Sequence, residues 1–186
     1  ADETAPMRPV SPYAVAKVAA HWLAAIERSV HGQFVCCGIL FNHESPLRGP
    51  EFVTRKITRG LVDWVAGHGG VLELGDVTME RDWGFAGDYV EAMWRMVQHE
   101  TPEDFVIATG RLHSVREFVT VAGAELGLDI VWSGEGPETR GVDRMSGRLV
   151  VASHPRWFRT NDHRGFAGDI TKARRLLGWE PRTSFE

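Results

Sequence analysis

The chain has no excess of basic residues, no long apolar segment and no metal-binding spacing of histidines. It carries 21 Lys and Arg against 25 Asp and Glu, a formal net charge of −4 at pH 7. A nucleic-acid-binding surface is usually basic, so we expect no nucleic acid partner. No apolar run approaches the roughly 20 residues that cross a bilayer, so we expect no membrane partner. The eight histidines lack HxxH or HExxH spacing, so we expect no metal site.

Cysteine is also scarce. The two cysteines, Cys36 and Cys37, are adjacent in an apparent strand, where successive side chains point to opposite faces. That geometry suits neither a shared metal nor a structural disulfide. We therefore expect two buried thiols in a reducing cytoplasm. Residues 1–6 (ADETAP) do not resemble a signal peptide.

A glycine-rich dinucleotide-binding loop is missing as well. Such a GxGxxG loop lies between a strand and a helix and places the helix N-terminus under a pyrophosphate. The nearest candidate, residues 67–70 (GHGG), precedes an apolar strand instead. If the chain belongs to a dinucleotide enzyme, the main cofactor-binding half is not in this sequence. We interpret the chain as the C-terminal portion of a larger enzyme.

What is present is typical of a globular α/β protein, with 43% hydrophobic and 25% charged residues. Apolar periodicity predicts helices over about 12–29, 51–65, 90–99, 114–127 and 171–177. It predicts strands over 35–41, 71–74, 105–108, 130–132 and 149–152, with loops over 42–49 and 134–147. In the third helix, large apolar residues form a stripe that we expect in the core: Val90, Met93, Trp94 and Val97.

The first helix carries the most distinctive chemistry. Ser11 can cap it, Pro12 suits its first position, and Gly32 is its stop signal. Tyr13 and Lys17 are one turn apart and therefore share a face. An ammonium at that distance favours a phenolate, so the tyrosine could exchange a proton during hydride transfer. A chance pairing is the alternative. The helix also has a broad apolar face suited to a core or a subunit partner: Val15, Val18, Ala19, Trp22, Leu23 and Ile26.

The polar loop 42–49 follows a near-continuous apolar strand, the position where open α/β sheets bind ligands. A merely solvated loop is the alternative. The next helix carries Arg55, Lys56 and Arg59 just beyond this candidate site. These basic residues could face an anion or form a solvated surface.

Several segments together resemble the GDP-mannose 4,6-dehydratase family of extended short-chain dehydrogenases/reductases. They are SPYAVAK (11–17), GILFNHESPLRG (38–49), FVTRKITR (52–59), RDWGFAGDYV (81–90), EDFVIATG (103–110) and TKARRLLGW (171–179). The resemblance extends from about residue 4 to 185. It implies an α/β fold: the C-terminal part of an NADP-binding Rossmann fold plus a smaller α/β substrate-binding domain. Residues 1–41 would end the Rossmann domain, and residues 42–186 would mainly form the substrate domain.

The resemblance also implies an activity, a cofactor and an assembly. Family members convert GDP-mannose to GDP-4-keto-6-deoxy-mannose with bound NADP, and so supply GDP-fucose and GDP-rhamnose. Tyr13 would take the C4 hydroxyl proton, and Lys17 would hold the nicotinamide ribose and favour the Tyr13 phenolate. His43 and Arg48 match cofactor-contacting positions. A cytoplasmic homo-oligomer, a dimer or tetramer, is expected for the full-length form.

The resemblance assigns further residues to the nucleotide sugar. Asn42 matches a contact to the pyrophosphate and Lys56 a contact to GDP. Arg81 and Arg159 match arginines that face the nucleotide's phosphates or ribose, a role that suits a guanidinium fork. Asp162 could accept a ribose hydroxyl.

The chain departs from the family pattern at three places. The catalytic Thr and Glu upstream of the tyrosine are absent, and Glu44 cannot be assumed to replace that Glu. Residues 159–163 read RTNDH where the family has Arg-Pro-x-Glu-Val, and the family's short terminal helix is missing after Glu186. Two alternatives therefore stay open. One is a non-catalytic module that binds a nucleotide sugar or pairs with a subunit, and the other is a related GDP-sugar reductase or epimerase.

Overall fold

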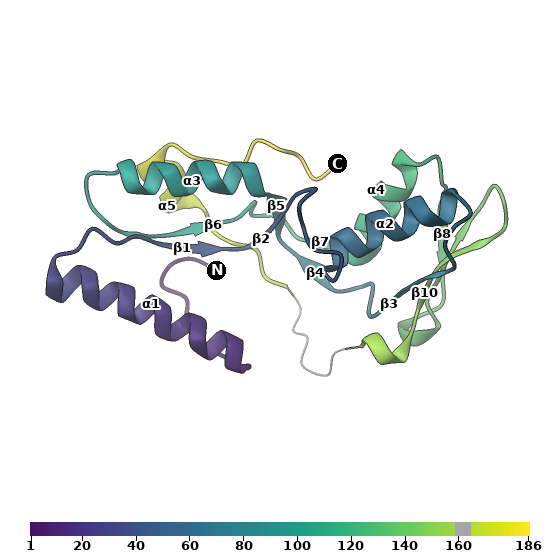
Figure 1. The fold of residues 1–186 in the computed structure, drawn as a ribbon, viewed down its shortest axis with the longest axis horizontal. Helices are drawn as coiled ribbons and strands as arrows, with labels where there is room; N and C mark the ends of the chain where they lie inside the picture. The colour runs from purple at the N-terminus through teal and green to yellow at the C-terminus, as the bar shows by residue number, and fades with distance from the viewer. Residues whose placement is uncertain (159–164) are drawn as a thin grey trace. The chain divides into compact units, whose positions relative to one another are not determined.

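The computed structural model describes residues 1–158 and 165–186 (Figure 1). The chain forms two compact units, each built from separate stretches of sequence. Unit 1 comprises Ala1–His43, Asp82–Arg111 and Ala167–Phe185. Unit 2 comprises Glu44–Arg81 and Leu112–Phe166, with the terminal Glu186. The chain therefore leaves unit 1 and returns to it twice.

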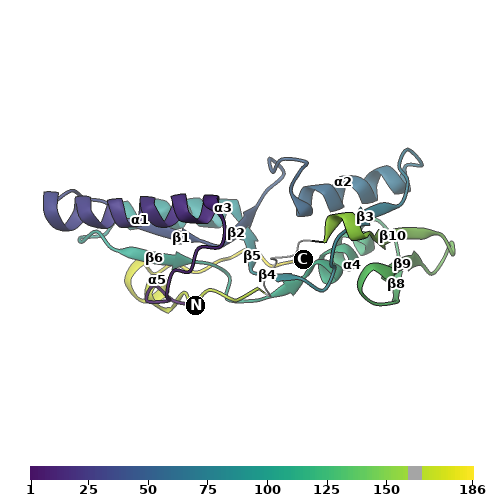
Figure 2. The same cartoon turned by 90° about the horizontal axis from the view of Figure 1, so that it is seen from below.

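Unit 1 is a two-stranded parallel sheet flanked by helices. Strands β1 (Cys37–Leu40) and β6 (Asp104–Ile107) pair in parallel. Figures 1 and 2 show α1 (Pro12–His31) on one face of this sheet and α3 (Ala86–Gln98) with α5 (Thr171–Leu177) on the other. Short strands β2 (Asn42–Glu44) and β5 (Trp83–Phe85) also pair. The core lies on the α3 and α5 face, and its largest members are Tyr89, Met96, Phe105, Ile107, Ile170 and Trp179.

The predicted core stripe of α3 is wrong. Val90 and Trp94 are 60% and 63% exposed, and Met93 and Val97 are exposed too. A neighbouring face is buried instead, through Tyr89, Ala92 and Met96. Both faces of this helix are apolar, and the buried face is the one that carries a small residue, which lets the helix approach β6 closely.

Helix α1 begins at the predicted residue and runs two residues beyond the predicted end, to His31, where the predicted stop signal Gly32 follows. Ser11 accepts a hydrogen bond from the backbone N–H of Ala14, Pro12 is the first helical residue, and Gly32 closes the helix with a φ of 63°. None of its residues is buried, and Trp22, Leu23 and Ile26 on the predicted apolar face are exposed. The cap residues fix the helix, but within the described residues its broad apolar face has no core to cover.

An ion pair joins α1 to the sheet. Arg28 contacts both carboxylate oxygens of Asp104, at 2.6 and 3.1 Å, and the His21 ring lies 3.7 Å from the same carboxylate. Burial alone would raise the pKa of Asp104, but the hydrogen bond and charge of Arg28 outweigh it and hold that pKa below its ordinary value of 3.8. Cys36 and Cys37 lie beside this pair and are only partly buried, which corrects the expectation of two buried thiols.

The ion pair predicts an acid-sensitive stability. A carboxyl with a lowered folded-state pKa stabilises the fold above its unfolded pKa and loses that contribution as the pH falls through the folded value. We expect Arg28→Met to lower the free energy of unfolding by about 1–3 kcal/mol near neutral pH, with the difference from wild type shrinking below about pH 4. Urea unfolding across this pH range measures it. Arg8→Met, which removes an exposed arginine, is the control, and a pH-independent difference would contradict the assignment.

Unit 2 is a four-stranded mixed sheet covered by two helices. The strand order is β3 (Leu72–Leu74), β10 (Leu149–Ser153), β9 (Arg140–Asp143) and β8 (Ile130–Ser133). Helices α2 (Val53–Val65) and α4 (Val115–Glu125) pack against each other and on β3 and β8 respectively. Single-turn helices η1 (Gly136–Glu138) and η2 (Pro155–Trp157) precede β9 and follow β10. The core is formed chiefly by Ile57, Leu61, Trp64, Leu72, Leu74, Val115, Val119, Ile130, Val150 and Val151.

Two predicted loops contain strands. Strand β9 lies within the predicted loop 134–147. This polar, glycine-containing segment pairs with β8 on one side and with β10 on the other. Gly141 suits this place, since a Cβ there would crowd the Ile130 and Trp132 side chains. Strand β2 occupies the start of loop 42–49. A short antiparallel pair, β4 (Glu80–Arg81) with β7 (His113–Ser114), precedes α4, and Ser114 caps α4 as its sequence predicts.

Candidate functional site

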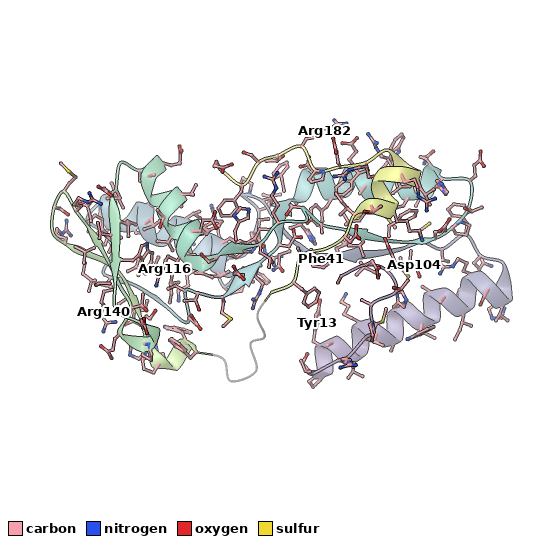
Figure 3. All side chains as sticks on the ribbon, turned by 180° about the vertical axis from the view of Figure 1, so that it is seen from behind. Tyr13, Phe41, Asp104, Arg116, Arg140 and Arg182 are labelled. Carbon is pink, nitrogen blue, oxygen red and sulfur yellow. The ribbon has the colours of Figure 1, made fainter. Side chains whose placement is uncertain are left out.

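The tyrosine and lysine of α1 lie on the same face, as predicted. The Lys17 ammonium is 5.6 Å from the centroid of the Tyr13 ring. Tyr13 is 72% exposed and lies in the first turn, next to the Ser11 cap (Figure 3). An exposed phenol beside an ammonium can exchange a proton with a bound molecule. Its position is fixed by local capping and helical geometry alone.

His43 has a defined tautomer. Its Nδ1 lies 2.8 Å from the carbonyl oxygen of Phe41, and because a carbonyl only accepts, Nδ1 carries a proton. In the neutral imidazole the other nitrogen, Nε2, is then an acceptor. The ring packs at 5.1 Å on the ring of Tyr89. Asn42 precedes it on β2 with its side chain exposed.

Tyr89 forms a rigid support beneath His43. It is fully buried, and burial together with the nearby Asp82 and Asp88 carboxylates raises its pKa above the ordinary value. Its hydroxyl has no hydrogen-bond partner among residues 1–158 and 165–186. Gly84 makes room for it, because a Cβ at that position would overlap the phenol ring. Segment 81–90, which begins with the predicted nucleotide contact Arg81, therefore also supplies Gly84 and Tyr89 to the packing of unit 1.

In unit 2, Glu44 organises the loop that follows β2. Its carboxylate accepts a hydrogen bond from the Thr54 hydroxyl at 2.6 Å and pairs with Arg48 Nε at 3.1 Å. The Arg48 guanidinium also lies 3.7 Å from the centroid of the Phe52 ring. Arg48 is thus held in one orientation by an acid and an aromatic face. The carboxylate of Glu44 is already engaged.

Lys56 lies on α2, close to the charged residues Glu73 and Arg156. Its Nζ donates to the carbonyl oxygen of Glu73 at 2.6 Å and lies 4.2 Å from the centroid of the Trp157 ring. Burial lowers the pKa of Lys56. Arg81 lies on β4, and its guanidinium donates to the Glu80 carbonyl at 2.7 Å.

The predicted site residues therefore fall into two groups. Tyr13, Lys17, Asn42 and His43 belong to unit 1, whereas Arg48, Lys56 and Arg81 belong to unit 2. Arg159 and Asp162 lie outside the described residues. Within the described residues no cluster of three or more His, Cys, Asp or Glu side chains could hold a metal ion, and no helix there has the length and apolarity to cross a membrane.

Sequence reasoning did not find the surroundings of Lys56. Glu73, Arg156 and Trp157 come from β3 and η2, far from Lys56 in the chain. An arginine next to a tryptophan directly after a strand was the only local signal. Asp82 was also missed as a packing residue: it is 2% exposed and accepts hydrogen bonds from the backbone of Thr109, Gly110 and Gly168.

Comparison with solved structures identifies the fold. Among solved structures, a dTDP-glucose 4,6-dehydratase from Bacillus anthracis in complex with NAD superposes with a TM-score of 0.77 at 21% identity, covering 99% of this chain and 51% of that one. The fold is that of the C-terminal part of an extended short-chain dehydrogenase/reductase: the end of a Rossmann fold with the smaller α/β domain. The predicted fold class is confirmed.

The sequence comparisons are more specific. A GDP-mannose 4,6-dehydratase from Sinorhizobium fredii is 50% identical over 183 residues, which are 98% of this chain and 52% of that protein. One from Dictyostelium discoideum is 48% identical over 183 residues, with 98% and 51% covered. The chain thus spans about half the length of these curated relatives. The family model described as GDP-mannose 4,6 dehydratase matches residues 1–186, and the chain belongs to that family.

Proposed function

We propose that the chain is the substrate-binding portion of an enzyme that converts GDP-mannose to GDP-4-keto-6-deoxy-mannose. The observation that carries the proposal is the exposed pair of Tyr13 and Lys17 on one face of α1, in a chain whose whole length matches the dehydratase family. The same proposal makes the enzyme a cytoplasmic homo-oligomer that supplies GDP-fucose or GDP-rhamnose. Its two thiols, which form no disulfide, are consistent with a reducing compartment.

The chain's own residues perform the proton chemistry at C4 of the mannose. Tyr13 accepts the proton of the C4 hydroxyl as that carbon becomes a ketone. Because the product keeps this ketone, Tyr13 gives the proton up to solvent, where it balances the hydroxide that leaves C6 as water. Lys17, on the same face, places its ammonium 5.6 Å from the centroid of the Tyr13 ring. A positioned acid–base group of this kind contributes about 10²- to 10⁴-fold to a rate.

The residues present fit NADP. When bound, NADP would supply a hydride acceptor for the oxidation at C4 and a hydride donor later in the same reaction. Lys17 would hold its nicotinamide ribose, since an ammonium can donate to both ribose hydroxyls. His43 Nε2 offers an acceptor for a hydroxyl or amide, because Nδ1 is fixed by Phe41. Arg48, held by Glu44 and Phe52, would add a guanidinium fork for a phosphate.

The nucleotide part of the substrate would contact cationic and polar side chains. In this proposal Lys56 contacts GDP, and Asn42 contacts the pyrophosphate. Arg81 and Arg159 contact the phosphates or ribose, and Asp162 accepts a hydrogen bond from a ribose hydroxyl. Proton removal from C5 needs a further carboxylate. Glu44 does not suit that task, since Thr54 and Arg48 already engage it. The C5 base is expected in the half of the enzyme that this chain does not span.

Turnover of GDP-mannose with NADP tests the proposal, measured on this chain and on its longest upstream-extended form. We expect the 4-keto-6-deoxy product from the extended form only. A different product, reduced or epimerised, would point to a related GDP-sugar enzyme. Failure of both forms to bind GDP-mannose would contradict the proposal.

A second candidate function is favoured by the apolar face of α1. Trp22 and Leu23 are 58% and 62% exposed there. Neighbouring large apolar side chains with this exposure are typical of a protein–protein interface. A non-catalytic chain that pairs with an intact subunit would use this face. It predicts GDP-mannose binding or co-purification with that subunit, and no turnover by either form of the chain.

A further inference from the structure

In unit 2 one acidic side chain lies between two cationic ones. The carboxylate of Glu73, on β3, forms an ion pair with the guanidinium of Arg156, on η2. The carbonyl oxygen of the same Glu73 accepts a hydrogen bond from Lys56 Nζ at 2.6 Å. Both cations also face the ring of Trp157, with Lys56 Nζ at 4.2 Å and the Arg156 guanidinium carbon at 4.7 Å from its centroid. We call these four residues the Lys56 cluster.

The backbone fixes this cluster. Strand β10 runs parallel to β3 and pairs Ser153 with Leu74, so the chain that follows β10 lies next to the end of β3. The N–H of His154 then donates to the Leu74 carbonyl at 2.8 Å, and the Ser153 hydroxyl donates to the Gly75 carbonyl at 2.9 Å. Gly75 has no side chain, and a Cβ there would overlap the carbonyl of Trp157. Helix η2 is therefore held directly against β3.

The contacts of Lys56 hold its ammonium without neutralising it. A carbonyl oxygen and an aromatic face attract a cation, but neither carries a formal charge. An ammonium has three donors, so donors remain after the bond to the Glu73 carbonyl. Burial lowers the pKa of Lys56; the charge of the Glu73 carboxylate opposes this shift, and the charge of Arg156 adds to it. If that carboxylate turned to Lys56, it would compete with any anionic ligand.

We propose that Arg156 is a positioning residue: it holds the Glu73 carboxylate away from Lys56, so that the Lys56 ammonium stays available to the phosphate oxygens of a nucleoside diphosphate. This inference rests on the proposed function, in which Lys56 contacts GDP. Arg156 acts through Glu73 and not by touching the nucleotide. The inference rests on the two contacts of Glu73. Its carboxylate pairs with Arg156, whereas its backbone carbonyl accepts the hydrogen bond from Lys56.

Calorimetric titration with GDP, on the longest natural form of the chain, tests the inference. Arg156→Met frees the Glu73 carboxylate to pair with Lys56, and we expect GDP to bind about threefold to tenfold more weakly, the range of a partly exposed ion pair. Adding Glu73→Gln removes the competing charge. The double variant Arg156→Met/Glu73→Gln should then bind GDP about as tightly as wild type. If it stays as weak as the single variant, Arg156 contacts GDP itself and the inference is overturned.

A second measurement does not depend on the ligand. The pKa of Lys56, followed by NMR of its side chain, should rise in Arg156→Met and fall back in the double variant. An unchanged pKa in Arg156→Met would overturn the inference whatever GDP does. If the pKa pattern appears but neither wild type nor variant binds GDP, the division of charge is supported and the proposed function fails. The two failures are thus distinguishable.

Arg148→Met provides the matched control. Arg148 lies over an aromatic ring in the same unit, 4.5 Å from the centroid of Trp64, and its removal changes the net charge equally. We expect GDP affinity and the pKa of Lys56 to stay at their wild-type values in this variant. Equal weakening in Arg148→Met and Arg156→Met would show a general effect of net charge and would overturn the inference.

Discussion

Replacement of Tyr13 by Phe is expected to lower kcat for GDP-mannose by about 10²- to 10⁴-fold, with the affinity for GDP-mannose nearly unchanged. The substitution removes one oxygen atom from a side chain that is 72% exposed, so it should not disturb packing. The lost oxygen is the proposed proton acceptor at C4. Steady-state kinetics and GDP-mannose titration on the upstream-extended form separate the loss of rate from any loss of binding.

The chain offers a matched control for that experiment. Tyr13 and Tyr89 are its two tyrosines, and Tyr89→Phe removes the same atom from a buried ring. The Tyr89 hydroxyl has no hydrogen-bond partner among the described residues, and the Phe ring would still support His43. We expect Tyr89→Phe to keep full turnover. Equal losses in both variants, or a loss of GDP-mannose affinity in Tyr13→Phe alone, would contradict the assigned role.

Helix α1 shows what the sequence can predict. A capping serine, a proline at the first position and a terminal glycine act within one turn of chain, so Ser11, Pro12 and Gly32 define the helix before any tertiary contact is known. The spacing of Tyr13 and Lys17 follows from helical geometry in the same way. Local rules suffice wherever the structure is set by neighbours in sequence.

Helix α3 shows where local rules fail. Its sequence is apolar on two faces, and large side chains such as Trp94 made the wrong face look like the core. The face that packs is decided by β6, which needs the small Ala92 and the ring of Tyr89 to fill a particular space. Periodicity shows which residues share an apolar stripe, but the surface of β6 decides which stripe is buried.

The candidate site shows the same limit. The family resemblance points to Lys56, but its surroundings come from distant segments, and Glu73 and Arg156 are 83 positions apart. No local pattern connects them. The parallel pairing of β3 with β10 brings them together.

Replacement of Asp82 by Ala is expected to be among the most destabilising single changes in unit 1. Its Oδ1 accepts hydrogen bonds from the N–H and hydroxyl of Thr109 at 2.8 and 2.6 Å, and its Oδ2 accepts from the N–H groups of Gly110 and Gly168, both at 3.0 Å. Hydrogen bonds to a charged group contribute about 1.5–3 kcal/mol each, and they are not additive. We expect a loss of at least about 3 kcal/mol in the free energy of unfolding.

Urea unfolding followed by fluorescence measures this loss, since Trp83 and Trp179 are buried in the same unit. Asp82→Asn keeps the volume but leaves only one acceptor oxygen, so it should lose a smaller part of the stability and still fold. Asp76→Ala is the control: within residues 1–158 and 165–186 that carboxylate accepts only from the N–H and hydroxyl of Thr78, two residues away, and its removal should cost about 1 kcal/mol.

The comparison decides whether Asp82 joins distant segments or merely shapes a turn. Thr109 and Gly110 follow β6, and Gly168 precedes α5, so one carboxylate ties two returning parts of the chain together. A loss in Asp82→Ala no larger than in Asp76→Ala would mean that these donors find water as readily as they find the carboxylate. A large loss that Asp82→Asn partly recovers would show that the buried acceptor holds the end of β6 in place.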